Sequence, residues 1–242
     1  TGSLTSSANT VGTDGADQSV YNLGAITSTN NVAIYFGGTD GLLDNSGTIS
    51  GTRAVWVNGG DAQLINRAGG TITGNSNFAL YLGQGGTIDN SGTIQALNSS
   101  PAVYVAGTAA ITNNAGGLIT SQGTTIAAYG AGSSLTNAGS VTSSNETAVY
   151  LAAGGTVTNS GSLTGGTGGY GLWTSAGGTF TNQAGGTITG GLGGMYLDGA
   201  NLVTVNLDAG STTGKIFSGG TGDRVINILG TLNGGYAGGS GA

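Results

Sequence analysis

A phrase of about eleven residues returns along this chain at a nearly constant interval. It reads LINRAGGTITG at 64–74, ITNNAGGLITS at 111–121 and TNQAGGTITGG at 181–191. One asparagine anchors each copy, and successive anchors stand about 23 residues apart, an interval typical of solenoid repeats. The anchors are Asn22, Asn45, Asn66, Asn90, Asn113, Asn137, Asn159 and Asn182, followed by the weaker matches Asn206 and Asn227. In a solenoid, each unit buries its apolar face against its neighbours.

A column of aromatic residues recurs with nearly the same period as the asparagines. It comprises Tyr35, Trp56, Tyr81, Tyr104, Tyr129, Tyr150, Trp173 and Tyr196. Two columns that share a period indicate one structural register, because chance would not keep them in step over so many units.

A unit of ~23 residues fits either a leucine-rich repeat or one coil of a β-helix. Leucine-rich repeats need a helical or 3₁₀ segment in each unit, whereas these units are rich in Gly, Thr and Val and hold no run of helix formers. We therefore predict an all-β fold, a single parallel β-helix of about ten coils over residues 22–235. Residues 1–21 are assigned to an N-terminal segment or first coil edge, and residues 236–242 to a Gly-rich C-terminal tail.

Alternation along the AVYV-type segments predicts which side chains face the core. Val55 and Val57 are expected inside, with the Trp56 ring pointing out. The small residue two places before each ring, such as Ala54, shares the ring's face. The inverse orientation of these strands is therefore still open.

The repeated asparagine has the same parity as the apolar residue two places before it, so Asn90 is expected to face inward beside Ile88. Asn tolerates the left-handed backbone that a sharp corner needs, and the Gly that follows avoids a Cβ clash. Stacked at the ~4.8 Å strand spacing, the buried amides can hydrogen-bond from coil to coil as an asparagine ladder. We assign this column a structural role, and ligation of sugar or metal by it is the less favoured alternative.

Composition excludes several functional classes. The chain has neither Cys nor His, which excludes thiol chemistry, His-based acid–base catalysis and the commonest zinc sites. Four basic residues against ten acidic ones give a net charge of −6, which argues against nucleic acid and anionic membranes as partners. No apolar run reaches the roughly 18 residues of a membrane helix, and no signal peptide opens the chain. We expect a mature segment or a fragment of a longer protein, with no cofactor and no bound metal.

The repeat units also resemble a known family. NSGTISG at 45–51, NRAGGTITG at 66–74 and NQAGGTITGG at 182–191, interleaved with AVYV-type strands, look like the passenger domains of autotransporters, bacterial proteins secreted through their own outer-membrane barrel. The run Gly214–Asp223 is similar to the last coils of many such passengers, although the family's barrel and folding core are not found in this sequence. The resemblance covers roughly residues 20–235. It implies a right-handed β-helix on a bacterial surface that serves adhesion, aggregation or biofilm formation.

Acidic residues offer an alternative function. Asp40 and Asp61 each stand five residues before an anchor asparagine, which places them ~5 Å apart on adjacent coils. Asp44 and Asp89 each precede an anchor by one residue and should lie roughly 9 to 10 Å apart, two coils from each other. Both separations overlap those of glycosidase carboxylate pairs. A carbohydrate-processing face is therefore one hypothesis, and a solvated acidic patch or a calcium site explains the same residues.

The aromatic column is the stronger binding candidate. Eight outward rings would form a ladder about 35 Å long, and an exposed stripe of that size suggests a contact surface for glycans, proteins or another copy of the chain. Ring-to-ring stacking within the scaffold is the structural alternative. We expect a non-enzymatic, secreted or surface-displayed protein that acts in adhesion, cell aggregation or biofilm structure. Unpaired strand edges at the first and last coils also predict end-to-end association into filaments.

Overall fold

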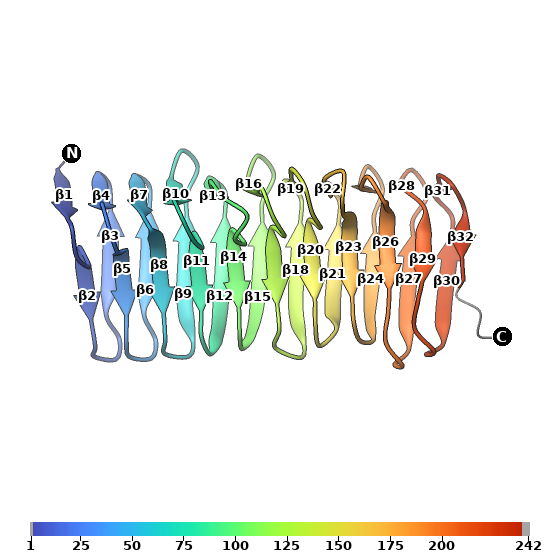
Figure 1. Cartoon of the computed structure of the whole chain (residues 1–242), viewed down its shortest axis with the longest axis horizontal. Helices are drawn as coiled ribbons and strands as arrows, with labels where there is room; N and C mark the ends of the chain where they lie inside the picture. The colour runs from blue at the N-terminus through green and yellow to red at the C-terminus, as the bar shows by residue number, and fades with distance from the viewer. Residues whose placement is uncertain (1, 239–242) are drawn as a thin grey trace.

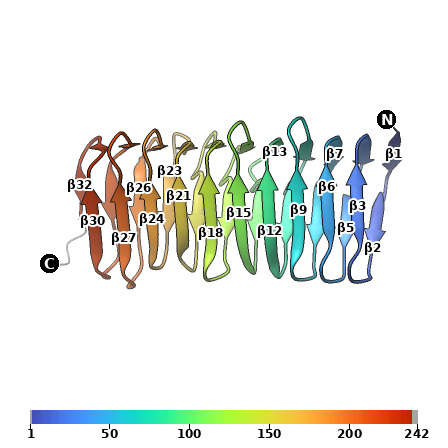
Figure 2. The same ribbon diagram turned by 180° about the vertical axis from the view of Figure 1, so that it is seen from behind.

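The computed structural model describes residues 2–238, which form a parallel β-solenoid of about ten turns. No helix occurs in that range, and three parallel sheets run along the rod with a repeat of ~23 residues. The chain passes from one end of the rod to the other, as Figure 1 and the reverse view in Figure 2 show. The predicted all-β solenoid is therefore confirmed.

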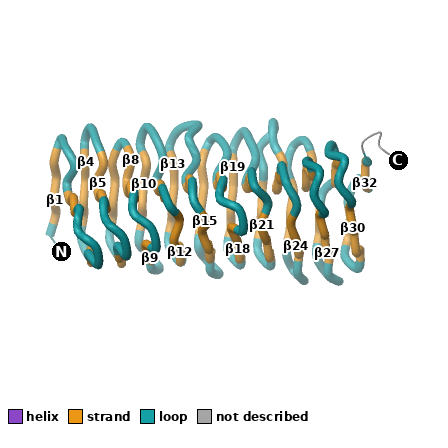
Figure 3. Tube along the Cα trace, turned by 90° about the horizontal axis from the view of Figure 1, so that it is seen from below, coloured by secondary structure: helices purple, strands orange, loops and turns teal. Residues whose placement is uncertain are grey.

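Each complete coil contributes one strand to each sheet, and loops join the strands at the corners (Figure 3). Sheet A contains β1 (Ser3–Ser6), β4 (Ala25–Ser28), β7 (Thr48–Gly51), β10 (Thr71–Gly74), β13 (Thr93–Ala96), β16 (Leu118–Ser121), β19 (Ser140–Ser143), β22 (Ser162–Thr164), β25 (Thr187–Thr189), β28 (Thr212–Thr213) and β31 (Thr231–Leu232). Sheet B contains β2 (Val11–Thr13), β5 (Val32–Phe36), β8 (Arg53–Val57), β11 (Leu80–Leu82), β14 (Val103–Val105), β17 (Ile126–Ala128), β20 (Val149–Leu151), β23 (Tyr170–Thr174), β26 (Gly193–Leu197), β29 (Ile216–Ser218) and β32 (Tyr236–Ala237). Sheet C contains β3 (Ser19–Asn22), β6 (Leu42–Asn45), β9 (Ala62–Asn66), β12 (Gly85–Asn90), β15 (Thr108–Asn113), β18 (Ser133–Asn137), β21 (Gly155–Asn159), β24 (Gly178–Asn182), β27 (Val203–Leu207) and β30 (Arg224–Ile228).

The stacked strands reach beyond residues 22–235 at both ends. Strands β1 and β2 pair with β4 and β5, and β32 pairs with β29. Residues 239–242 of the expected C-terminal tail lie outside the described residues.

The core is the interior of the rod, and alternation along sheet B has the favoured orientation. Val55 and Val57 are fully buried, while the Trp56 ring between them points outward and is half-buried. Ala54 is also buried although it shares the parity of the ring, because its position lies where the coil turns in from sheet A. At the equivalent Gly171 a Cβ would lie only 2.8 Å from the backbone oxygen of Thr189, so that position has no room even for a methyl group.

A continuous asparagine ladder closes the sheet C edge of the core. Each Nδ2 donates to the Oδ1 of the asparagine one coil further on, at 2.7 or 2.8 Å, from Asn22 through to Asn182. The same Nδ2 reaches two backbone carbonyls; for Asn90 these are Gly92 O and Leu118 O. The eight side chains are at most 5% exposed, so the ladder satisfies amide groups that burial would otherwise leave unpaired.

The expected left-handed backbone at these asparagines is wrong. Among the described residues other than Gly, only Asp17, Asp40 and Asp61 have positive φ, at 56 to 59°. The anchor asparagine instead ends an extended strand, and in the first two coils the Oδ1 of Asn22 and of Asn45 accepts a hydrogen bond from the N–H two residues on. At these two anchors the side chain stabilises the turn, and none of the eight asparagines has a strained backbone.

The weak anchors Asn206 and Asn227 do not continue the ladder. Leu207 pairs with Asn182 in the sheet and takes the buried position, so Asn206 faces outward. At this end Asn182 donates to Thr213 Oγ1 instead, at 2.9 Å. The ladder thus stops where an apolar residue replaces the amide.

Candidate binding face and pocket

The outer face of sheet B carries the aromatic column. Its members pair directly from strand to strand: Tyr35, Trp56, Tyr81 and Tyr104 in one run, and Tyr150, Trp173 and Tyr196 in the next. All seven rings are half-buried. The column therefore has one side in contact with protein and one side open to a partner.

Tyr129 does not belong to the column in which its spacing placed it. Ile126 and Ala128 face the core, so Ala127 is the residue that pairs with both Tyr104 and Tyr150. Tyr129 follows the strand and still brings its ring between its neighbours, with centroids 5.0 Å from Tyr104 and 6.0 Å from Tyr150. Partial burial raises the pKa of its phenol, with smaller contributions from the same two tyrosines.

Three further rings join this face. Phe217 pairs with Tyr196 and continues the column by one coil, a member that its position one repeat after Tyr196 could have revealed. Tyr170 begins β23 and Phe78 lies two residues before β11, and their rings contact the column at 5.2 Å from Tyr196 and 4.9 Å from Tyr104.

Ring-to-ring contacts run from Trp56 to Tyr196. Trp56 and Tyr81 are stacked with centroids 4.2 Å apart, Tyr81 and Tyr104 are stacked at 5.5 Å, and the pairs from Tyr104 onward are tilted or edge-on. Each such contact stabilises a fold by ~0.5–1.5 kcal/mol. The column therefore supports the scaffold as well as presenting a surface.

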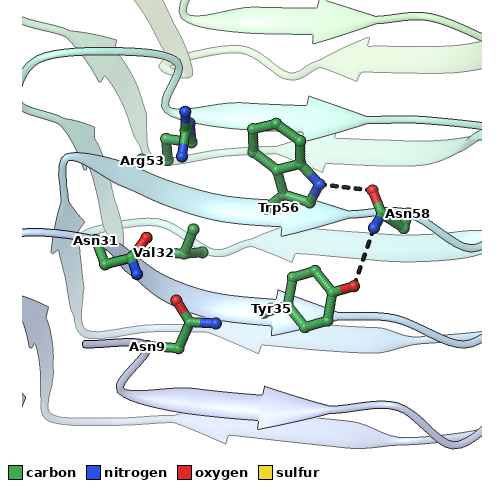
Figure 4. Close-up of a pocket in the computed structure, with 7 residues that line it drawn as sticks. All are labelled: Asn9, Asn31, Val32, Tyr35, Arg53, Trp56 and Asn58. Atoms are coloured by element: carbon green, nitrogen blue, oxygen red, sulfur yellow. Dashed lines mark hydrogen bonds between the residues drawn. The ribbon is translucent and has the colours of Figure 1, made fainter.

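The contacts are interrupted at the N-terminal end of the face. In the described chain no ring contact joins Tyr35 to Trp56; Asn58 links them instead. Trp56 Nε1 donates to Asn58 Oδ1 at 2.6 Å, and Asn58 Nδ2 donates to the Tyr35 hydroxyl at 2.9 Å (Figure 4). The interruption is an open pocket of about 300 Å³, lined by Asn9, Asn31, Val32, Tyr35, Arg53, Trp56 and Asn58.

Arg53 differs from the other arginines in its hydrogen bonding. Its guanidinium lies 4.7 Å from the centre of the Trp56 ring, and its buried Nε has no hydrogen-bond partner. Arg67, by contrast, forms a bidentate pair with Asp44, and Arg224 donates to five backbone carbonyls. No acidic residue lines the pocket, so the charge of Arg53 is not neutralised there.

The Asp40 and Asp61 column exists and contains a third acid. Asp17 stands five residues before Asn22, the same spacing, and sheet register stacks it under Asp40. All three take the left-handed backbone, which Asp tolerates, so their recurring position follows from the corner they form. Within the described part of the chain, no three acidic, His or Cys side chains are grouped as a metal site requires.

Asp44 and Asp89 occupy one outward column two coils apart, as their spacing indicated. Asp89 accepts a hydrogen bond from Asn114, and Arg67 holds Asp44 at 2.6 Å through both of its oxygens. The Arg67 hydrogen bonds lower the pKa of Asp44, against a smaller opposing effect of burial. A glycosidase acid needs a raised pKa, so Asp44 is poorly suited to donate a proton at neutral pH.

A carboxyl NMR titration should therefore place the midpoint of Asp44 below the ordinary value of 3.8. Arg67→Gln should return it toward 3.8, because the hydrogen bonds are the largest cause of the shift. The Asp44–Arg67 pair stabilises the fold at every pH above 3.8, the ordinary pKa of the carboxyl group. This stabilisation is lost as the pH falls through the lowered pKa of Asp44 in the folded protein. An unchanged midpoint in Arg67→Gln would contradict the assignment.

Compared with protein-family models, with curated proteins and with solved structures, the chain has no match in any of the three. In residues 2–238 no helix has the length and apolar character needed to span a membrane.

Proposed function

We propose that this chain is a non-enzymatic bacterial β-solenoid, secreted or displayed on the cell surface, whose sheet B face acts in adhesion or cell aggregation. One observation carries the proposal: a row of outward, half-buried rings follows the rod over most of its length. Exposed apolar stripes of this extent usually mark contact surfaces. Aromatic side chains are also the residue type most enriched in such contacts.

Two further features support the proposal. The repeat units resemble autotransporter passengers, and a parallel β-solenoid is compatible with that family. The chain also offers little for catalysis, since it lacks Cys and His and its best-placed acid, Asp44, is paired with Arg67. A long, repetitive contact face suits attachment better than turnover.

The double substitution Tyr104→Ser and Tyr129→Ser tests the proposal. In cells that display the chain, we expect clumping to fall by about tenfold or more, because removing a central ring from a contact surface costs ~2 kcal/mol of binding. Clumping is measured as the half-time of sedimentation. The purified variant should keep its β-sheet circular dichroism, since the two rings lie outside the core.

Tyr21→Ser is the matched control. Tyr21 is 68% exposed but lies on sheet C, away from the column, so its replacement should leave clumping unchanged. If the double variant clumps normally and only its unfolding temperature falls, the rings belong to the scaffold and the proposed contact face is wrong.

A further inference from the structure

The pocket between Tyr35 and Trp56 carries a more specific preference than the rest of the face. We propose that it binds a carboxylate-bearing sugar, that is, a uronic acid residue of an acidic glycan. This inference deepens the proposed function and rests on it, since it names the class of ligand that the N-terminal end of the adhesive face takes.

The guanidinium of Arg53 supplies the first part of the argument. It lies 4.7 Å from the centre of the Trp56 ring, and none of its N–H groups donates a hydrogen bond to a described residue. Only Nε is buried, so the two terminal nitrogens of Arg53 are open to the pocket and can donate to an incoming carboxylate. The planar fork of an arginine matches the two oxygens of a carboxylate, so the preferred anion is of that kind.

Charge supports the same ligand. The chain as a whole is negative, at −6, yet none of the pocket's seven lining residues is acidic. The nearest acid, Asp14, lies beside the edge of the Tyr35 ring at Gly37 and does not line the pocket. An acidic polymer is therefore attracted to Arg53 in this pocket and repelled along the corner formed by Asp17, Asp40 and Asp61.

The remaining lining indicates that the carboxylate belongs to a sugar. Two rings provide flat apolar surfaces, and the amides of Asn9, Asn31 and Asn58 surround them (Figure 4). An amide both donates and accepts hydrogen bonds, as hydroxyl groups require. Asn9 and Asn31 are exposed, and in the described chain their side chains make no hydrogen bond, so both are free to meet a ligand.

The shape of the pocket agrees with this chemistry. Its volume of about 300 Å³ is at the lower end of the range for ligand sites, and it is broadly open to solvent. It therefore suits one sugar ring of a chain that continues over the surface. Asn58 holds both rings through its two hydrogen bonds, so the site is formed before the ligand arrives.

Isothermal titration calorimetry of the whole chain tests the inference. The probe is an α-1,4-linked trimer of galacturonic acid, and its fully methyl-esterified form is the matched control that keeps the sugar but removes the charge. We expect the acid trimer to bind and its affinity to fall roughly 10- to 100-fold in Arg53→Gln, as for loss of a charge-assisted hydrogen bond. Arg67→Gln removes the same charge outside the pocket and should leave affinity unchanged.

Arg53→Lys separates charge from geometry. It keeps the positive charge but not the fork, so we expect a smaller loss than in Arg53→Gln. Urea unfolding of each variant shows that the fold persists, and Arg53→Lys keeps the test valid if Arg53→Gln does not fold.

Three results would overturn the inference: equal binding of the acid and ester trimers, undiminished binding in both Arg53 variants, or equal competition by the peptide acetyl-Gly-Gly-Glu. The last would assign the pocket to a peptide carboxylate. Absence of trimer binding, with clumping still lost in the Tyr104 and Tyr129 variant, would reject the inference and leave the proposed function standing. Trimer binding that depends on Arg53, with normal clumping in the Tyr104 and Tyr129 variant, would support the carboxylate site and reject the proposed function.

Discussion

Replacing Asn113 by alanine is expected to lower the free energy of unfolding by about 3–5 kcal/mol. Its Oδ1 accepts from Asn90 and its Nδ2 donates to Asn137, both at 2.8 Å, and the residue is fully buried. The substitution leaves the buried Asn90 Nδ2 without its ladder acceptor and the buried Asn137 Oδ1 without its ladder donor. Each lost partner costs ~1–3 kcal/mol. The cavity left behind adds to this cost.

Asn227→Ala is the matched control, measured by the same urea titration. Asn227 Nδ2 donates to Asn206 Oδ1 at the same 2.8 Å, but this pair is exposed, so water replaces the lost partner. We expect a change within ~0.5 kcal/mol. Equal losses in the two variants would mean that burial does not set the strength of the ladder.

Gly92→Ala should destabilise the fold by about 3 kcal/mol, at the upper end for overpacking. A Cβ at Gly92 would overlap the carbonyl oxygen of Gly70 and lie 2.5 Å from that of Arg67. Both atoms are backbone in the preceding coil, so neither can move without disturbing the stack. The glycine of the repeated turn is needed because two coils approach closely there.

Two other glycines separate this steric effect from backbone strain. Gly69 faces open space but has φ of 83°, so Gly69→Ala should cost ~1–2 kcal/mol. Gly12 faces open space with no positive φ, and Gly12→Ala should change stability by less than ~0.5 kcal/mol. Urea unfolding that ranks the three variants in any other order would contradict the close-approach explanation.

The sequence alone was sufficient for the features that repeat in every coil. The period of the asparagines predicts the solenoid, and parity predicts that Asn90 and Ile88 share the core, as both are buried. Parity also favours the outward position of Trp56 between Val55 and Val57. These features are local, because alternation along a strand decides which face each side chain takes.

Only the tertiary structure decided the features in which one coil differs from its neighbours. Spacing placed Tyr129 in the aromatic column. Because Ile126 and Ala128 are buried in the core, Ala127 takes the column position between them. Spacing also predicted Asn206 as an anchor asparagine, but Leu207 pairs with Asn182 and takes the buried position. The loops differ by a residue or two from coil to coil, so spacing in the sequence does not fix the strand register. The register is set by which side chains can be buried against the neighbouring coil.

The pocket likewise depends on tertiary structure. Arg53 has the strand parity of the buried Val55, yet at the strand start its side chain reaches the Trp56 ring instead of the core. Asn58 joins two rings that come from successive repeats of the sequence. Contacts between side chains of different coils make this site, and such contacts are set by the stacking of coils, which no single repeat encodes.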